Sequence, residues 1–255
     1  MCIVKMIDAR SVMPLVQDWE ETLIWSCLQG CMGQAWVVQG PVVESVQFSV
    51  ADFCFFAGKP NVELVRHKPT VDRDFVIMIP QTEEWGTLIE EVYGTRATKC
   101  MRYAIKKEPF VFDKEKLAHF ASQLSPAYTL TMISEIQYNQ IRELPWARDL
   151  CSNFLTYEDF RKNGIGVVVL KNGEIVSGAS SYSYYQGGIE IEIDTREDQR
   201  RRGLALACGA KLILECLKQG IYPSWDAQNK GSVALAEKLG YHFEKEYIAY
   251  EIYPY

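Results

Sequence analysis

A run of arginines that ends in a glycine is the first segment with clear chemical potential. Arg200, Arg201 and Arg202 precede Gly203-Leu204-Ala205, and the apolar spacing that follows predicts a helix over 203–217. The first turn of a helix carries unpaired N–H groups and the positive end of the helix dipole, so it attracts anions. Gly203 lets the backbone approach an anion closely. The segment fits a pyrophosphate, although a solvated basic loop before an ordinary helix has the same pattern.

A second polar segment lies between a predicted strand over 222–227 and a predicted helix over 232–239. Asn229 stands just past this strand, where its side chain can hydrogen-bond a ligand held between two splayed strands. Asn229 and Ser232 are also ordinary turn and helix-cap residues. Taken alone, the segment fits the structural role better than the binding role.

Carboxylates alternate with isoleucines along Ile189-Glu190-Ile191-Glu192-Ile193-Asp194. Alternate residues of a strand point to one face, so the three carboxylates share a face. A carboxylate placed in this way can take a proton from an amine nucleophile, directly or through water. Glu190 and Glu192 are the candidates, and Asp194 is the weaker one because it begins the loop. The alternative interpretation is a solvent-facing acidic stripe on a half-buried strand.

The elements that position these residues follow from local signals. Ser134 with Gln137 and Thr156 with Asp159 open two helices, and Asn172-Gly173 is typical of a hairpin turn. The second half is predicted to run strand, two helices, three strands, helix, strand, helix, strand. The predicted strands cover 128–133, 166–170, 175–185, 189–195, 222–227 and 243–253.

The first half has weaker signals, and the predicted boundary is Ser125-Pro126, giving domains 1–125 and 126–255. Apolar residues every four positions predict one helix that ends at Gly30. One or two strands over 42–56 follow, then a strand over 75–79, a helix capped by Thr82, a strand over 96–105 and a helix capped by Asp113. The residues of the first helical pattern are Leu15, Trp19, Leu23 and Cys27.

Together, the two polar segments resemble the GNAT superfamily of acetyltransferases, and the order of elements in the second half matches as well. In that family an Arg/Gln-x-x-Gly-x-Gly/Ala loop cradles the pyrophosphate of coenzyme A, and a later Asn-containing stretch contacts the coenzyme. The strand Ile-Glu-Ile-Asp-Thr and the segment Ser-Trp-Asp-Ala-x-Asn look closer still to the branch that includes zwittermicin A resistance acetyltransferases. The matching residues are Arg200, Gly203 and Ala205, then Asn229, Ser232, Leu235, Lys238, Gly240 and Tyr241.

The resemblance implies an α/β (α+β) fold, with a GNAT-like mixed central sheet flanked by helices in the second half. It implies acetyl-CoA as the cosubstrate and an amine as the acceptor, with Glu190 or Glu192 as the base. We expect a small-molecule amine; a peptide or protein amine, or a non-catalytic coenzyme-binding protein, are the alternatives. The implied coenzyme contacts are Ile193, Thr195, Arg200, Arg201, Arg202, Gly203, Leu204, Ala205, Asn229 and Ser232.

One position departs from the family pattern. Many members have a tyrosine after the Leu of the later stretch, which protonates the departing thiolate, and here Ala236 stands in its place. The acid is either absent or replaced by a group such as Tyr241 or Ser232. A thiol whose pKa lies near ~8.5 is a fair leaving group at neutral pH, so the loss is tolerable.

The order of elements in residues 1–125 loosely repeats that of the second half. We therefore expect a degenerate copy of the same fold that binds no second coenzyme; an unrelated α+β domain is the alternative. Its strand-to-helix junction is taken to be the segment from Pro80 to Trp85. There Pro80 offers no N–H, and Glu83 and Glu84 repel a pyrophosphate.

Composition excludes several other classes of protein. A net charge of −6 disfavours general nucleic-acid binding. No apolar run approaches the roughly 20 residues that a membrane helix needs. The sequence also begins without a signal peptide's apolar core, so we expect a cytoplasmic protein. The eight cysteines have no C-x-x-C spacing and no accompanying histidine cluster, which argues against a metal site.

Overall fold

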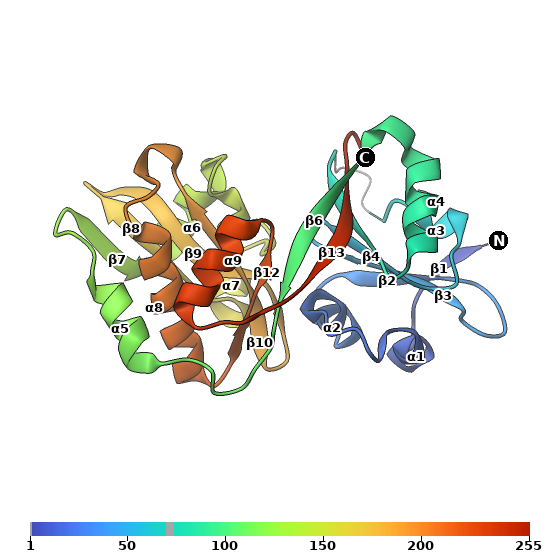
Figure 1. Ribbon diagram of the computed structural model, residues 1–255, viewed down its shortest axis with the longest axis horizontal. Helices are drawn as coiled ribbons and strands as arrows, with labels where there is room; N and C mark the ends of the chain where they lie inside the picture. The colour runs from blue at the N-terminus through green and yellow to red at the C-terminus, as the bar shows by residue number, and fades with distance from the viewer. Residues whose placement is uncertain (1, 70–73) are drawn as a thin grey trace. The chain divides into compact units, whose positions relative to one another are not determined.

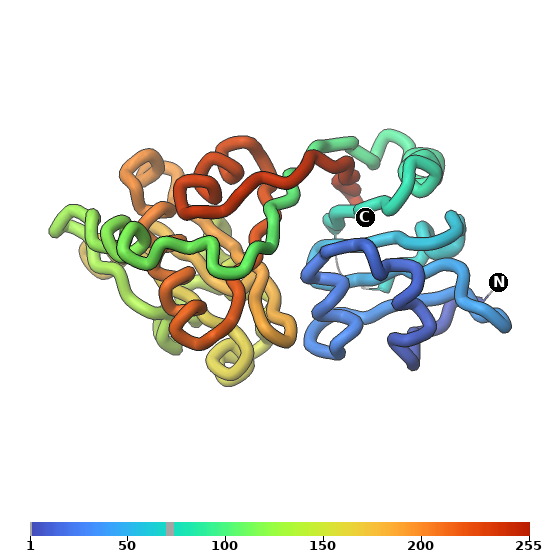
Figure 2. The backbone as a smooth tube through the Cα atoms, turned by 60° about the horizontal axis from the view of Figure 1, so that its bottom comes forward, coloured from blue at the N-terminus to red at the C-terminus, as the bar shows by residue number. Residues whose placement is uncertain are grey.

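The computed structural model describes residues 2–69 and 74–255. Within them the chain forms two units: the first contains residues up to Arg102 together with Glu246–Tyr255, and the second contains Tyr103–Lys245. The C-terminal segment therefore returns to the first unit, as the red end of the tube in Figure 2 shows. Two strands, β6 (Ala97–Ile105) and β13 (Phe243–Ile252), contribute residues to both units.

This division differs from the predicted boundary at Ser125-Pro126. Helix α5 (Lys114–Ser122) begins at its predicted cap Asp113, but it belongs to the second unit. Its buried Leu117 lies in the same core cluster as helix α8 (Leu204–Gln219), with Phe120 packed against that cluster. The apolar face of α5 thus packs on residues that follow the predicted boundary in the sequence, not on residues that precede it.

The second unit is built on a five-stranded sheet in the order β11-β10-β9-β8-β7, of which β7 to β10 are labelled in Figure 1. Neighbouring strands are antiparallel except β10 and β11, which run parallel. The hairpin between β8 and β9 turns at Asn172 and Gly173, both at positive φ, as predicted. The strands are β7 (Tyr128–Met132), β8 (Gly166–Lys171), β9 (Glu174–Tyr185), β10 (Gly188–Thr195) and β11 (Tyr222–Ser224).

Helices cover both faces of this sheet. Helices α5, α8 and α9 (Lys230–Leu239) pack on one core cluster, and α6 (Glu135–Glu143), α7 (Tyr157–Asn163) and a short turn at Arg148–Leu150 pack on another. The predicted caps are present: Ser134 and Gln137 form a capping box, and the Thr156 hydroxyl accepts a hydrogen bond from the Asp159 N–H. The predicted strand over 222–227 is split at Trp225, because β12 (Asp226–Ala227) pairs with Tyr103 and Ala104 of β6 instead.

The first unit contains a sheet in the order β1-β2-β3-β4-β5-β13-β6. Its largest buried side chains include Trp85 and Ile89 of α4 (Glu83–Tyr93), which pack with Met78 and Tyr250. Helix α4 follows Thr82 and ends before Gly94, as predicted. The other strands are β1 (Ile3–Lys5), β2 (Gln34–Val38), β3 (Ser45–Val50), β4 (Phe53–Gly58) and β5 (Val76–Pro80).

The single helix predicted near the start of the chain is wrong. It is two helices, α1 (Met13–Val16) and α2 (Thr22–Leu28). Glu21 has an extended backbone, and its carboxylate accepts a hydrogen bond from the Leu23 N–H, so α2 begins anew at this cap. The four-residue apolar spacing therefore runs through two separate helices. The sequence also gave no signal that was recognised for β1 or β2.

The two halves of the chain, up to β6 and after it, have the same order of elements. In the first, β1, α1, α2, β2, β3, β4, α3 (Val62–Arg66), β5, α4 and β6 follow one another; in the second, β7, α6, α7, β8, β9, β10, α8, β11 with β12, α9 and β13 do. The pairing also agrees, since three antiparallel pairs are followed by a parallel pair, β4–β5 or β10–β11. The counterpart of the loop before α8 is thus the β4–α3 junction, not the Pro80–Trp85 segment assumed from the sequence.

Candidate functional site

Helix α8 begins with its first-turn N–H groups unblocked by any side chain. Gly203 is the residue before the helix; it has a φ of 79° and forms no side-chain cap. A Cβ added there would meet no atom within 4 Å, so the left-handed backbone, rather than crowding, requires glycine. Arg200, Arg201 and Arg202 are all exposed beside it. The loop thus presents N–H donors and cationic side chains at one helix end, which suits an anion.

A buried glutamine holds this loop in place. Gln199 is 5% exposed, and its Oε1 accepts a hydrogen bond of 3.0 Å from the Tyr128 hydroxyl, while its Nε2 donates to Asp198. Arg196 is occupied by ion pairs with Asp198 at 2.7 Å and Glu174 at 3.1 Å. Arg196 therefore stabilises the loop, whereas the arginines predicted to contact the coenzyme are the separate residues Arg200 to Arg202. Sequence reasoning missed Gln199, because its partner Tyr128 lies far away in the chain.

Strands β10 and β11 pair only over their first residues. The recorded pairs are Gly188 with Tyr222, Ile189 with Pro223 and Glu190 with Ser224, whereas β10 continues to Thr195. Beyond Trp225, β12 pairs with β6 instead. The two parallel strands therefore part after Glu190, which is the splayed geometry expected from the sequence.

Several predicted coenzyme contacts have side chains committed elsewhere. Ile193 and Leu204 pack with the core cluster of α8, and the Thr195 hydroxyl lies 2.7 Å from that of Ser177. Ala205 is half-buried. Leu204 is 1% exposed, so only its backbone is left to meet a ligand.

Asn229 and Ser232 act as local structural residues. The Asn229 side chain caps α9 by accepting a hydrogen bond from the Ser232 N–H at 3.0 Å, and the Ser232 hydroxyl accepts one from Trp225 Nε1. These are the turn and cap roles weighed in the sequence. They leave both residues beside the end of β12, where the two parallel strands have separated.

Neither Tyr241 nor Ala236 supplies an acid for a leaving thiolate. Ala236 is fully buried, and the Tyr241 hydroxyl donates to the Pro223 carbonyl at 2.6 Å. Burial raises the pKa of Tyr241 well above its usual range. Tyr241 is therefore a packing residue whose proton is already bound to the backbone.

The acidic stripe of β10 is not a solvent-facing surface. Glu190 is only 6% exposed, and Glu192 and Asp194 are half-buried. Their partners on β9 are Gly178, opposite Asp194, and Ser180, opposite Glu192. Both partners face the turn at Arg148–Leu150. A Cβ on Gly178 would meet the Leu150 side chain, and the Ser180 hydroxyl donates to the Leu150 carbonyl. The carboxylates thus line a protein-enclosed face.

Glu190 lies among hydroxyl groups at the point where β10 and β11 part. It pairs in register with Ser183 on β9 and Ser224 on β11. The Tyr185 hydroxyl is 2.9 Å from that of Ser224, and burial, with a contribution from the Glu190 charge, raises the pKa of Tyr185 to about 12. A bulge in the β9–β10 pairing lies next to this group, between Glu190 and Ile191. The sequence showed the carboxylate but not its hydroxyl surroundings.

The carboxylate of Asp194 has a strongly perturbed pKa. Burial, and then the nearby negative charge of Asp149, raise its pKa from 3.8 to about 6, while Arg200 opposes the rise. Groups with pKa values shifted toward neutrality gather at functional sites. The sequence placed Asp194 below Glu190 and Glu192, because nothing in the sequence indicated that Asp149 is close.

The mixed sheet flanked by helices, the parallel strands that separate and the uncapped helix start beside them are the features of the acetyltransferase fold that the sequence resembles. A family model described as GNAT acetyltransferase matches residues 13–250. The chain belongs to this family, and the match extends into both units. The predicted family and the predicted mixed α/β fold are thereby confirmed.

Solved and curated relatives agree with this assignment. A GCN5-related N-acetyltransferase-like protein from Streptococcus suis is 43% identical, with a TM-score of 0.90 over 96% of this chain and 98% of that one. The uncharacterized N-acetyltransferase YdfB of Bacillus subtilis is 26% identical over 68% of this chain and 64% of that protein, so the match spans less than two thirds of that relative. A tandem GNAT protein from the clavulanic acid biosynthesis pathway shares the fold at 10% identity, with a TM-score of 0.56 over 100% of this chain and 98% of that one.

Two further properties concern the described residues. Across residues 2–69 and 74–255, no helix has the length and apolar character needed to cross a membrane. The same residues contain no group of three or more His, Cys, Asp or Glu side chains arranged to hold a metal ion. All eight cysteines are free thiols.

Proposed function

We propose that this protein transfers the acetyl group of acetyl-CoA to the amine of a small molecule, and that the second unit carries the chemistry. The observation that supports this most directly is the placement of the open start of α8 beside the gap between β10 and β11. The pyrophosphate would lie against the first-turn N–H groups and Arg200 to Arg202. The pantetheine would follow the β10 backbone from Thr195 toward Glu190, where a strand edge without a partner offers hydrogen bonds.

The reaction proposed is direct attack. The neutral amine nitrogen bonds to the thioester carbonyl carbon, the carbon–sulfur bond breaks, and its electron pair leaves with the thiolate of coenzyme A. The proton lost by the amine goes to Glu190 or Glu192, directly or through water. For an amine with a lysine-like pKa of about 10.4, deprotonation at pH 7 costs roughly 4–5 kcal/mol, which is the reason for a base. The thiolate is then protonated by solvent, consistent with Ala236 standing in place of an acid.

We further propose that the first unit is a degenerate copy that binds no second coenzyme. Its counterpart of α8 is α3, where the Asn61 side chain accepts hydrogen bonds from the Glu63 and Leu64 N–H groups. These donors are the ones that a pyrophosphate would need. The first unit also lacks a counterpart of the gap between β10 and β11, because its parallel strands β4 and β5 stay paired from Phe53–Ile77 to Phe56–Pro80. Both features support one coenzyme per chain.

A non-catalytic coenzyme-binding protein is the alternative that a specific residue favours, namely Ala236. The discriminating experiment incubates the protein with acetyl-CoA and a panel of small amines and peptides, and follows the release of free thiol. Release that depends on an amine supports the enzyme. Coenzyme binding without release from any amine or peptide supports the alternative. If only peptide amines are acetylated, the acceptor class proposed here is wrong.

Binding is tested first, by the rise in melting temperature that a ligand specific to the folded state produces. Gly203→Glu places a carboxylate against the pyrophosphate and should abolish the rise. The absence of any rise with the wild-type protein at millimolar acetyl-CoA would contradict the proposal. The zwittermicin A resistance branch and the cytoplasmic location remain predictions from the sequence, and an antibiotic amine in the panel addresses the first of them.

A further inference from the structure

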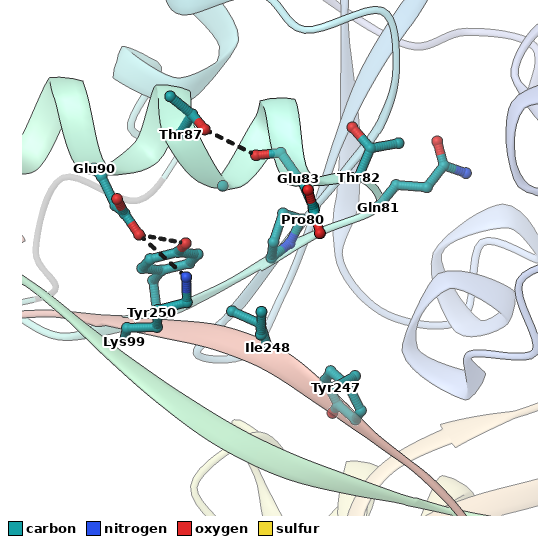
Figure 3. Close-up of a pocket in the computed structure, with 11 residues that line it drawn as sticks. Pro80, Gln81, Thr82, Glu83, Thr87, Glu90, Lys99, Tyr247, Ile248 and Tyr250 are labelled. Carbon is teal, nitrogen blue, oxygen red and sulfur yellow. Dashed lines mark hydrogen bonds and ion pairs between the residues drawn. The ribbon is translucent and has the colours of Figure 1, made fainter.

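The first unit contains a cavity of about 720 Å³ between α4 and the strands β6 and β13 (Figure 3). It lies within one unit, because Lys99 of β6 and residues Tyr247 to Tyr250 of β13 all belong to the first unit, as α4 does. Its volume falls in the range of about 300–1,000 Å³ that small-molecule sites occupy. Nothing in the proposed acetyl transfer uses it.

One wall is the polar face of α4. Glu83, Thr87 and Glu90 are spaced by four and three residues, so they line one side of the helix (Figure 3). Gly86 lies on the same side, and a Cβ there would come within 2.9 Å of the Tyr250 hydroxyl. A glycine inside a helix costs about 1 kcal/mol relative to alanine, and here it admits Tyr250, whose hydroxyl donates to Glu90 at 2.7 Å.

The opposite wall already holds one ammonium group. Lys99 Nζ lies 3.5 Å from Glu90 Oε1 and 5.7 Å from the centre of the Tyr250 ring. A carboxylate and an aromatic face are the two groups that proteins use to bind cationic nitrogen. The hydrogen bond from Tyr250 lowers the pKa of Glu90, which keeps this carboxylate charged.

The other end of the cavity has a carboxylate and no cation of its own. Glu83 is exposed, and among the described residues its carboxylate enters no recorded ion pair; only its backbone carbonyl is used, by the Thr87 hydroxyl. The lining of the cavity thus contains two carboxylates and one lysine. The Thr87 hydroxyl donates to the Glu83 backbone carbonyl and the Thr82 side chain is hydrogen-bonded to Glu84, so both hydroxyls keep lone pairs that can accept from a ligand. Ile248 supplies an apolar surface (Figure 3).

We propose that this cavity binds a small primary amine that also carries hydroxyl groups. Its ammonium group pairs with Glu83, its hydroxyls meet Thr82 and Thr87, and its carbon chain lies along Ile248. An anionic ligand is disfavoured, because Glu83 and Glu84 occupy the start of α4. This site is independent of the coenzyme site and of the proposed reaction, so either proposal can fail without the other.

Isothermal titration calorimetry of the full chain, without acetyl-CoA, tests the proposal with three matched six-carbon probes. Glucamine carries both the amine and the hydroxyls, sorbitol replaces the amine by a hydroxyl, and hexylamine lacks the hydroxyls. Saturable binding is expected for glucamine, with affinity at least about fivefold weaker for each of the other two. No saturable heat from glucamine at tens of millimolar overturns the proposal. Equal affinity for sorbitol shows that the cation is not recognised and also overturns it.

Variants locate the binding. Glu83→Gln should weaken glucamine binding about three- to tenfold, as loss of one charge-assisted contact at a part-exposed site predicts. Glu91→Gln is the matched control: it removes the same charge from the same helix at an exposed residue that does not line the cavity, so affinity should stay within about twofold. Equal effects of the two variants would place the amine elsewhere.

A lysine variant decides the sign of the ligand charge. Lys99→Met removes the ammonium group that now contacts Glu90 and Tyr250. A ligand ammonium can then bind there, so glucamine affinity should rise about threefold. If the cavity instead prefers an anion, the same variant weakens binding of inorganic pyrophosphate and does not improve binding of glucamine, and the proposal is wrong. Amine-dependent thiol release in the presence of acetyl-CoA, measured separately, reports on the proposed function alone.

Discussion

Glu190 and Glu192 differ in their surroundings although they share a face of β10. Glu190 is buried among the hydroxyls of Ser183, Ser224 and Tyr185, whereas Glu192 is half-buried opposite Ser180. A base must meet the amine where the thioester lies, and the strands part directly after Glu190. The geometry therefore favours Glu190 over Glu192 as the general base. The alternation of carboxylates and isoleucines in the sequence could not distinguish the two.

Replacing the base should lower turnover in a pH-dependent way. Glu190→Gln is expected to reduce the rate at pH 7 by about 10²–10⁴-fold, with partial recovery as rising pH deprotonates the amine itself. Glu192→Gln should have a smaller effect, and Glu143→Gln, an exposed residue of α6, should have none. Thiol release across pH 6–9 measures this, and coenzyme affinity should stay near wild type. If Glu190→Gln and Glu192→Gln both keep full activity throughout, the stripe has no role as a base.

Asp194 should make the protein less stable as pH rises. Its pKa is 3.8 in the unfolded chain and about 6 in the folded one, so the folded state holds its proton more tightly. Stability is therefore unaffected below about pH 4, falls between about pH 4 and 6, and stays lower above. Asp194→Asn should be more stable than wild type by about 1–2 kcal/mol at pH 7, after allowance for partial exposure, and equal to it at pH 4.

Urea unfolding at several pH values from 4 to 8 measures this difference, with Asp198→Asn as a control of opposite sign. Hydrogen bonds from Arg196 and Gln199 lower the pKa of Asp198 to about 2, so its contribution is present at neutral pH and lost in acid. A neutral-pH gain in stability from Asp198→Asn, or none from Asp194→Asn, would contradict these assignments.

At the scale of elements, α8 lies between two glycines, Gly203 and Gly220, that share a left-handed backbone conformation. Only the Gly203 end lies at the proposed coenzyme site. Gly203 has a φ of 79° and Gly220 a φ of 71°, and a Cβ on either would meet no atom within 4 Å. Alanine at either position should cost about 1 kcal/mol, because the left-handed region is strained for a residue with a Cβ.

Only the first substitution should affect the coenzyme. Gly203→Ala puts a methyl group, and a shifted first turn, where the pyrophosphate is proposed to lie, so acetyl-CoA affinity should fall roughly tenfold or more. Gly220→Ala destabilises the same helix at its far end and should leave affinity unchanged. Thermal unfolding and calorimetry on the two variants measure both effects. Equal affinity in both would show that α8 contributes stability and no ligand site.

At the scale of the whole molecule, local signals and long-range contacts were predicted with different success. The capping box at Ser134, the turn at Asn172-Gly173 and the glycine before α8 depend on neighbours in sequence, and each was predicted. The return of β13 to the first unit, the hydrogen bond from Tyr128 to Gln199 and the charge of Asp149 beside Asp194 join distant residues. No periodicity or short motif encodes such contacts, so the matching junction of the first half was also misplaced.

The division of the chain leads to a prediction about fragments. Residues 103–245 contain all of the core cluster around α8, including Leu117 of α5, and the pairing of Tyr103 and Ala104 with β12. Residues 126–255 lack α5 and carry Tyr250 and Ile252, which are buried in the first unit. Exposing an apolar face that α5 covers removes several kcal/mol at roughly 25 cal/mol per Å², a large share of a domain's stability.

The fragment 103–245 should therefore unfold cooperatively on heating and bind acetyl-CoA within about threefold of the full chain. The fragment 126–255 should lack a cooperative transition or aggregate, because both the uncovered core and the displaced strand expose apolar side chains. Circular dichroism, gel filtration and calorimetry on the two fragments decide the matter, and the full chain should bind one coenzyme. Cooperative folding of 126–255 together with failure of 103–245 to fold would restore the boundary at Ser125-Pro126. Two coenzymes per full chain would show that the first unit has kept a coenzyme site, which Asn61 and the β4–β5 pairing are expected to close.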